Sequence, residues 1–328
     1  MTTPRLDVTI AGELNLDLVL DGIPETMPVE RELLASAFHI TLGSSAAILA
    51  HNLAALKTRV GFASLAARDG FAGMALDFLT RRQVDLSAMR TSDGATGSGV
   101  TVVVNHGAVR HILSYLGTNA ELNGDHLDLD YLCSARHFHL SSLFLLKGLH
   151  PALPGLFKAI KQRGLTISLD TNDDPDDRWG GVLEELLPFV DVLLPNEREL
   201  LRIANAASLE EALASVSRKV PLTVVKCGAK GAIVQQGARR ELIAGVKVSP
   251  VDAIGAGDSF NAGFLACFVR GLQPEICAAA GNVTGALSTL KQGGIEAFRD
   301  DAFLRQSLHG LAPDWPLLQN LEQSCADQ

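Results

Sequence analysis

The sequence predicts an α/β protein whose mainly parallel central sheet is covered by helices on both faces, with a small β-rich lid beside it. Short apolar runs typical of buried strands alternate with helical segments through most of the 328 residues, an order that implies parallel strands joined by helical crossovers. Two other segments, 13–41 and 96–119, favour a sheet with one wet face. A hydrophobic share of 47% and a charged share of 20% permit a large buried core.

Each predicted element follows from local periodicity. In 14–20 the alternation places Asn15 and Asp17 on one face of a strand and leucines on the other. The lid hairpin within 99–115 turns at Asn105-His106-Gly107. The other expected strands are 6–11, 60–65, 136–140, 165–169, 191–194 and 222–225, and the expected helices are 44–57, 71–82, 149–163, 179–187, 197–203 and 209–219.

These elements suggest one core, one lid and a tail. We expect the core to comprise residues 1–12, 42–95 and 120–310, the lid to comprise 13–41 and 96–119, and the tail to comprise 311–328. A net charge of −9 disfavours nucleic acid and anionic membranes as partners. The five cysteines show no C-x-x-C pair, and no secretory or membrane-spanning segment is evident. We therefore expect a cytoplasmic protein.

The segment 251–263 carries the strongest functional signal. An apolar run with Val246, Val248 and Val251 predicts a strand before it, and a helical pattern follows. A glycine-rich turn thus leads into a helix, whose unpaired N–H groups can bind an anion. An aspartate in the first turn, Asp258, suits phosphoryl transfer, because amides can hold the moving group while a carboxylate accepts a proton. The alternative is an ordinary turn and helix cap.

This segment and the order of elements resemble the ribokinase-type (PfkB) carbohydrate kinases from about residue 7 to about residue 298. The resemblance implies a three-layer α/β/α sandwich with a β lid, and transfer of the γ-phosphate of ATP to a hydroxyl of a small sugar. It makes Asp258 the base, and makes Gly255, Ala256, Gly257 and the Asp258 N–H the anion hole. Asp252 would bind a monovalent cation such as K+, although Ala253 stands where the family commonly has threonine.

Other motifs match the nucleotide side of that family. Residues 193–199 resemble its N-x-x-E element, in which Asn196 would contact the nucleotide and Glu199 would hold Mg2+ through water. A plain capping box is the alternative for this pair. Residues 223–232 resemble the nucleotide strand and turn, unless they form only a β-turn between strands. The resemblance assigns nucleotide contacts there to Lys226, Gly228 and Gly231, and an adenine contact to Asn282.

The sugar side matches less completely. Its expected residues are Gly12, Asn15, Asp17, Gly43 and Asn172. In the paired-glycine segment Leu42 replaces the first glycine, and Ala47 stands where a sugar-contacting asparagine is common. Asp170-Thr171-Asn172 follows a strand and matches the family's D-x-N element near the sugar. The alternative for this element is a strand-ending turn.

The expected activity is that of an ATP-dependent sugar kinase. A nucleoside kinase, with Phe38 or Phe144 as the wall for the base, and a non-catalytic sugar-binding regulator remain alternatives. Ser44 occupies a position where some sugar-phosphate kinases carry lysine, which favours an unphosphorylated sugar, although Arg68 or Arg110 could supply charge. A one-sided lid sheet needs cover, and this favours a homodimer formed through the lid.

Overall fold

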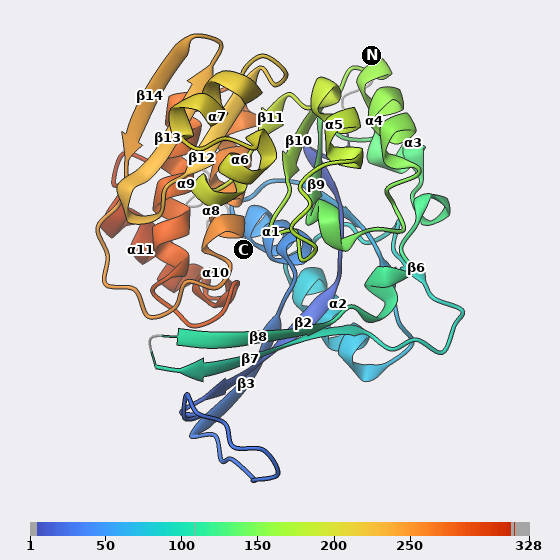
Figure 1. The fold of residues 1–328 in the computed structure, drawn as a ribbon, viewed down its shortest axis with the longest axis vertical. Coiled ribbons are helices and arrows are strands. Elements are labelled where there is room, and N and C mark those ends of the chain that lie inside the picture. Colours follow the sequence, from blue (N-terminus) through green and yellow to red (C-terminus); the bar gives the residue numbers. More distant parts are fainter. Residues whose placement is uncertain (1–4, 108, 316–317, 319–328) are drawn as a thin grey trace.

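A computed structural model describes residues 5–107, 109–315 and 318 of the chain. Within these residues, eight strands form the central sheet in the order β14-β13-β12-β11-β10-β9-β1-β4 (Figure 1). The strands from β4 to β12 run parallel, and β13 and β14 add an antiparallel edge. Their bounds are β1 (Val8–Ala11), β4 (Val60–Ala63), β9 (His137–Ser141), β10 (Thr166–Asp170), β11 (Val192–Leu193), β12 (Leu222–Lys226), β13 (Gly231–Gln236) and β14 (Arg239–Ala244).

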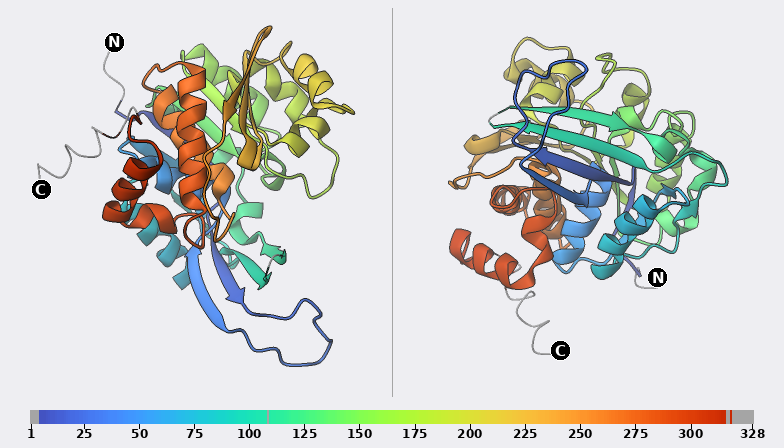
Figure 2. Two further views of the ribbon diagram at one scale, coloured as in Figure 1. Left: turned by 90° about the vertical axis from the view of Figure 1, so that its left-hand side faces the viewer. Right: turned by 90° about the horizontal axis from the view of Figure 1, so that it is seen from below.

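Helices cover both faces of this sheet, so the predicted three-layer α/β/α fold is confirmed (Figure 2). One face carries α1 (Ser45–Ala55), α2 (Gly70–Arg81), α8 (Ala256–Phe268), α9 (Pro274–Ser288), α10 (Glu296–Arg299) and α11 (Asp301–Leu311). The other carries α3 (Leu129–Leu132), α4 (Leu153–Gln162), α5 (Val182–Leu186), α6 (Glu197–Ala204) and α7 (Leu209–Val216). Short 3-10 turns are η1 (Gly117–Ala120), η2 (Gly124–His126), η3 (Leu143–Leu145), η4 (Leu187–Phe189) and η5 (Gly228–Lys230).

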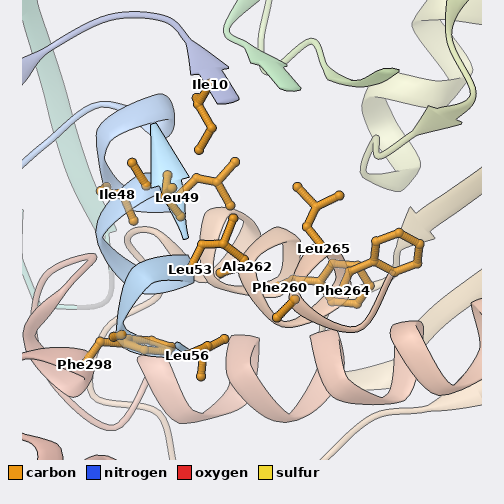
Figure 3. Close-up of a cluster of buried hydrophobic side chains, with 14 of the residues drawn as sticks. Ile10, Ile48, Leu49, Leu53, Leu56, Phe260, Ala262, Phe264, Leu265 and Phe298 are labelled. Carbon is orange, nitrogen blue, oxygen red and sulfur yellow. The ribbon is translucent and has the colours of Figure 1, made fainter. Parts of the chain in front are cut away.

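The core beside the candidate site is built where α1 packs against α8 (Figure 3). Leu49 and Leu53 of α1 are fully buried with Ala262 and Leu265 of α8. At about 25 cal/mol per Å² of apolar surface, each buried leucine stabilises the fold by roughly 2 kcal/mol. Gly263 is required where α8 meets α9, because a Cβ would overlap the Thr284 hydroxyl. This packing fixes the N-terminus of α8 at one edge of the sheet.

A smaller sheet projects from the core as the predicted lid (Figure 2). Its strands are β2 (Asn15–Asp21), β3 (Ala37–Leu42), β7 (Gly99–His106) and β8 (Val109–Tyr115), in the order β3-β2-β7-β8. The predicted hairpin is present as β7 and β8, and these strands lie beside β2. A separate parallel pair joins β5 (Leu65–Ala66) to β6 (Arg90–Thr91).

Two expectations need correction or restriction. The strand predicted around Val246–Val251 is absent from the structure, where this stretch is irregular. Pro250 has no N–H to donate to a sheet, and the Val251 N–H bonds instead to the Thr289 carbonyl at 2.7 Å. Most of the predicted tail, 311–328, lies outside the described residues, but Trp315 and Leu318 are buried against the core. No helix in the described part of the chain has the length and apolarity needed to cross a membrane.

Candidate active site

The first turn of α8 presents an anion cradle at the sheet edge. Gly255 caps the helix at φ +70°, and a Cβ there would collide with the Gly294 backbone, so the position requires glycine. The Ala256 N–H makes a long bond to Ala253 O at 3.3 Å. For the Gly257 and Asp258 amides no acceptor appears among the described residues. Two of the predicted amides are therefore available to a phosphoryl group.

A cavity of about 610 Å³ opens beside this turn. Most of the residues predicted to meet the nucleotide line it together with the cradle, namely Ala256, Gly257, Lys226, Gly228, Gly231 and Asn282. Gly231, at φ +104°, has no room for a Cβ beside Ile243 O. The Asn282 amide donates to Ile243 O and Ala244 O at 3.1 Å each, so it fixes the cavity wall. The irregular stretch that replaced the predicted strand also lines this cavity, through Val246 and Val248.

Asp258 is mostly but not fully buried at the third position of α8. Burial raises its pKa to about 6, with a further rise from the Asp170 and Glu13 charges. A hydrogen bond donated by the Ser45 hydroxyl and the Lys226 charge oppose that rise. At neutral pH the carboxylate is therefore mostly ionised but more basic than an ordinary aspartate, which suits a general base.

An ion pair lies between Asp258 and the sheet. Lys226 Nζ donates to Asp170 Oδ2 at 2.6 Å, and Asn261 Nδ2 donates to the same oxygen at 2.5 Å. Burial acts to raise the pKa of Asp170, but Lys226 and Asn261 hold it below its ordinary value. Asn261 stands one helical turn after Asp258, and this i, i+3 spacing was the overlooked signal for its presence in the site.

The Asn196–Glu199 pair forms the capping box that was the alternative in the sequence. The Glu199 N–H donates to Asn196 Oδ1 and the Asn196 N–H donates to Glu199 Oε2, each at 2.9 Å. Burial, and then the Asp170 charge, raises the pKa of Glu199 to about 7. The Asn196 side-chain amide also donates to Glu199 Oε1, so both carboxylate oxygens are occupied, and a magnesium ion would be held through water rather than by direct contact, as predicted.

The residues predicted to bind the acceptor gather where the lid meets the core. A Cβ on Gly43 would lie 2.7 Å from Asp17 Cγ, so only glycine lets β3 pass this carboxylate. Asn15 Nδ2 donates to Thr101 Oγ1 at 3.1 Å, which commits part of its amide to the lid. Gly12 sits against Ala46 at the start of α1. Burial, followed by the charges of Asp258 and Asp252, raises the pKa of Asp17 to about 7.

Asn172 is joined to this region by hydrogen bonds through Ser142 and Glu13, two residues that the sequence analysis did not identify. Its Nδ2 donates to Ser142 Oγ at 2.7 Å, and Ser142 Oγ donates to Glu13 Oε1 at 2.6 Å. The Ser45 N–H also donates to Glu13 Oε1, at 2.9 Å. Glu13 is only 4% exposed, and its other oxygen has no partner among the described residues. The sequence signal for Glu13 was its position directly after Gly12.

Polar contacts bridge the lid and the core next to the anion cradle. Arg110 of β8 donates to Asp252 Oδ1 at 3.2 Å, and the Gly293 N–H donates to Asp252 Oδ2 at 3.0 Å. Gln292 donates to Asp21 of β2 at 2.9 Å, and segment 289–296 thus binds both the lid and the Asp252 loop. A guanidinium already neutralises Asp252, so this carboxylate does not fit the expected monovalent cation site.

Part of the outer face of the lid is apolar. Thr41 and Asp17 share the inner face, so Phe38, three residues before Thr41, faces outward and is 56% exposed. Leu113 and Tyr115 lie on the same outer face, at 58% and 61% exposure. Phe144, the other candidate wall for a nucleobase, is buried edge-on against Trp179.

The proteins that are similar to this chain are kinases, in agreement with the geometry of the site. Residues 6–301 match the pfkB family carbohydrate kinases. The ATP-dependent ribose-1-phosphate kinase of Halopiger xanaduensis is 30% identical over 301 residues, covering 90% of this chain and 96% of that protein. The cytidine kinase of Thermococcus kodakarensis is 27% identical over 88% of this chain and 98% of its own.

A solved structure shares the whole architecture. Arabidopsis thaliana ribokinase, complexed with ribose and ATP, superposes with a TM-score of 0.78 at 22% identity, covering 92% of this chain and 98% of that one. The match of residues 6–301 spans nearly the whole chain. The chain therefore belongs to the pfkB family of carbohydrate kinases, phosphotransferases whose acceptor is a hydroxyl group.

Proposed function

We propose that this protein is an ATP-dependent kinase that transfers the γ-phosphate to a hydroxyl of a small neutral sugar, with Asp258 as the base. One observation carries the proposal. The first turn of α8 faces the nucleotide cavity through Ala256 and Gly257, while its Asp258 carboxylate meets Ser45 and lies near Asp17 on the acceptor side. A base placed between donor and acceptor is what in-line phosphoryl transfer needs.

In this mechanism Asp258 accepts the proton of the acceptor hydroxyl as that oxygen attacks the γ-phosphorus. The Gly257 and Asp258 amides stabilise the charge that develops on the transferred group. Lys226, fixed by Asp170 at the cavity wall, adds positive charge near the same turn. Magnesium held through water by Glu199 would neutralise phosphate charge. The closed lid excludes water, which limits wasteful hydrolysis.

Charge supports a neutral acceptor over a phosphorylated one. Glu13, Asp17 and Asp258 all bring acidic groups to the acceptor region, and the ionised groups among them would repel a second phosphate. Arg110 is committed to Asp252, and Arg68 is paired with Asp93 at 2.9 Å on the surface. The substrate named for the Halopiger relative, ribose 1-phosphate, is therefore a poorer candidate here than an unmodified sugar.

We also propose that the outer face of the lid pairs with the lid of a second copy. The exposed Phe38, Leu113 and Tyr115 form an apolar strip on one side of a sheet whose other side is used by the site. An exposed apolar surface of this kind is stabilised when another protein surface packs against it. A twofold pair of identical faces is the simplest cover.

The test is a screen for ADP release over pentoses, hexoses, sugar phosphates, keto-deoxy acids and nucleosides, with magnesium and with or without potassium. We expect turnover with one or a few neutral sugars, and its loss in Asp258→Asn. Preference for a nucleoside would establish the nucleoside kinase alternative. Ligands that stabilise the protein without any ADP release would instead establish a sugar-binding regulator.

A further inference from the structure

Ser45 occupies the first turn of α1, where it touches the carboxylates of Glu13 and Asp258. Its N–H donates to Glu13 Oε1 at 2.9 Å, and its hydroxyl donates to Asp258 Oδ1. Ser45 is itself only 8% exposed. Because an ionised carboxylate only accepts hydrogen bonds, the single hydroxyl hydrogen of Ser45 must point to Asp258.

Glu13 holds Ser45 in this place. Its Oε1 also accepts from Ser142 Oγ at 2.6 Å, and Ser142 accepts from Asn172 Nδ2 at 2.7 Å. Hydrogen bonds therefore link Asn172 on the sugar side to Ser45, with Glu13 Oε1 accepting from both Ser142 and the Ser45 N–H, and the Ser45 hydroxyl donates on to Asp258. The contacts that it contains join segments as much as 213 residues apart.

We propose that Ser45 is a positioning residue for the base: its hydroxyl occupies Oδ1 of Asp258 and leaves Oδ2 to take the proton of the acceptor hydroxyl. This inference rests on the proposed kinase activity. A buried carboxylate can still rotate about its Cβ–Cγ bond, and a donor on one oxygen removes that freedom. The same donor stabilises the ionised form that a base requires.

The other charged groups that face Asp258 come from elements other than α1, so we expect them to keep their places when Ser45 is changed. Asp17 comes from β2, Asp170 from β10, Lys226 from the end of β12, and Glu13 from the turn after β1. The effect of removing the hydroxyl is therefore confined to the hydrogen bond that it makes.

The experiment compares the pH profiles of kcat/KM for wild type, Ser45→Ala and Ser44→Ala. Ser44 is the N-cap of α1; its hydroxyl accepts from the Ala47 N–H and donates to the Glu13 backbone carbonyl at 2.7 Å, and no hydrogen bond joins it to Asp258 in the structure. We expect Ser45→Ala to move the acid limb upward by about one pH unit and to lower kcat about tenfold, with the KM for ATP unchanged. Ser44→Ala should lower the melting temperature but leave the limb in place. Ser45→Thr, which keeps a hydroxyl, should restore the wild-type limb.

A second readout does not depend on turnover. The protein is labelled with ¹³C at aspartate carboxyl carbons, and the Asp258 signal is assigned by its loss in Asp258→Asn. Ser45→Ala, or Ser45→Gly if the alanine variant does not fold, should raise the pH midpoint of that signal. An unchanged midpoint refutes the role of Ser45. Wild-type protein that phosphorylates nothing refutes the proposed function, while the midpoint still decides whether Ser45 supports the ionised carboxylate.

Discussion

Asp258→Asn should lower the kinase activity and raise the stability of the protein. The amide keeps the size of the side chain, and its oxygen can still accept from Ser45, but it cannot take a proton from the acceptor. General-base catalysis typically contributes about 10²- to 10⁴-fold, or about 3 to 5 kcal/mol of barrier, so kcat should fall by that factor.

Stability should rise because burial makes the ionised carboxylate unfavourable. The pKa of Asp258 rises from its ordinary value of 3.8 to about 6. A shift of about two units at about 1.4 kcal/mol per unit corresponds to an upper bound of about 3 kcal/mol. For a carboxyl group whose pKa is raised by folding, this cost is fully present above the folded value and disappears as the pH falls to the unfolded value. The gain in Asp258→Asn should therefore be largest near neutral pH and vanish near pH 4.

Thermal unfolding of both proteins across this pH range, beside ADP-release kinetics, measures the two effects. A gain of about 3 kcal/mol corresponds to a rise in melting temperature of several degrees for a chain of this size. Substantial turnover in Asp258→Asn would contradict its role as base. A melting difference that is the same at pH 4 and pH 8 would show that the carboxylate is not the buried, destabilising charge described above.

Three further substitutions test the acceptor site, the lid contact and the lid surface. Gly43→Ala places a Cβ against the Asp17 carboxylate, so the KM for the acceptor should rise at least about tenfold while the KM for ATP holds, as steady-state kinetics will show. Arg110→Met should raise the acceptor KM only a few-fold, because the partly exposed ion pair between Arg110 and Asp252 is weak. The same variant should make the rate respond to K+, because Asp252 is then unpaired. The wild-type rate should be insensitive to K+ in the same titration. If the proposed lid-to-lid dimer forms, Phe38→Arg should convert it to a monomer in light scattering, because a charge would then be buried in the apolar lid contact.

Each substitution has a matched control elsewhere on the chain. Gly73→Ala lies in α2 with open space around its Cβ, Arg68→Met removes an exposed pair with Asp93, and Ile276→Arg charges an exposed apolar residue of α9 that is 43% exposed. All three should behave as wild type. Equal acceptor KM values for Gly43→Ala and Gly73→Ala, strong K+ activation of the wild type, or a wild type that is already monomeric would each contradict its own prediction.

Most of the fold could be predicted because its buried parallel strands are apolar runs between turn signals. Residues 136–140 and 165–169 became β9 and β10 within about one residue at each end. Strand β14 was missed because its sequence, RRELIA, has neither an apolar run nor clear alternation, and an edge strand need not be buried on both faces. Residues 246–251 misled in the opposite way, since valine spacing typical of a strand serves there to line a cavity.

In the candidate site, the residues of a local motif could be predicted from the sequence, and the residues that depend on long-range contacts could not. Asp258 and its glycine turn are local, and local chemistry can be recognised in a sequence. Glu13, Ser45 and Ser142 acquire their meaning only from contacts between distant segments, such as the 129-residue separation of Glu13 and Ser142. The Arg110–Asp252 pair is another case, because nothing in either segment indicates that the lid reaches the loop before α8.

The contact between Gly255 and Gly294 leaves no slack between two loops that meet different partners. One loop begins α8, whose first turn is the proposed phosphoryl site, and the other holds Asp21 of the lid through Gln292. Neither loop can shift without displacing its neighbour. A displacement of Asp21 and the lid would therefore also displace Gly255 and the first turn of α8, which is where we propose that the phosphoryl group binds.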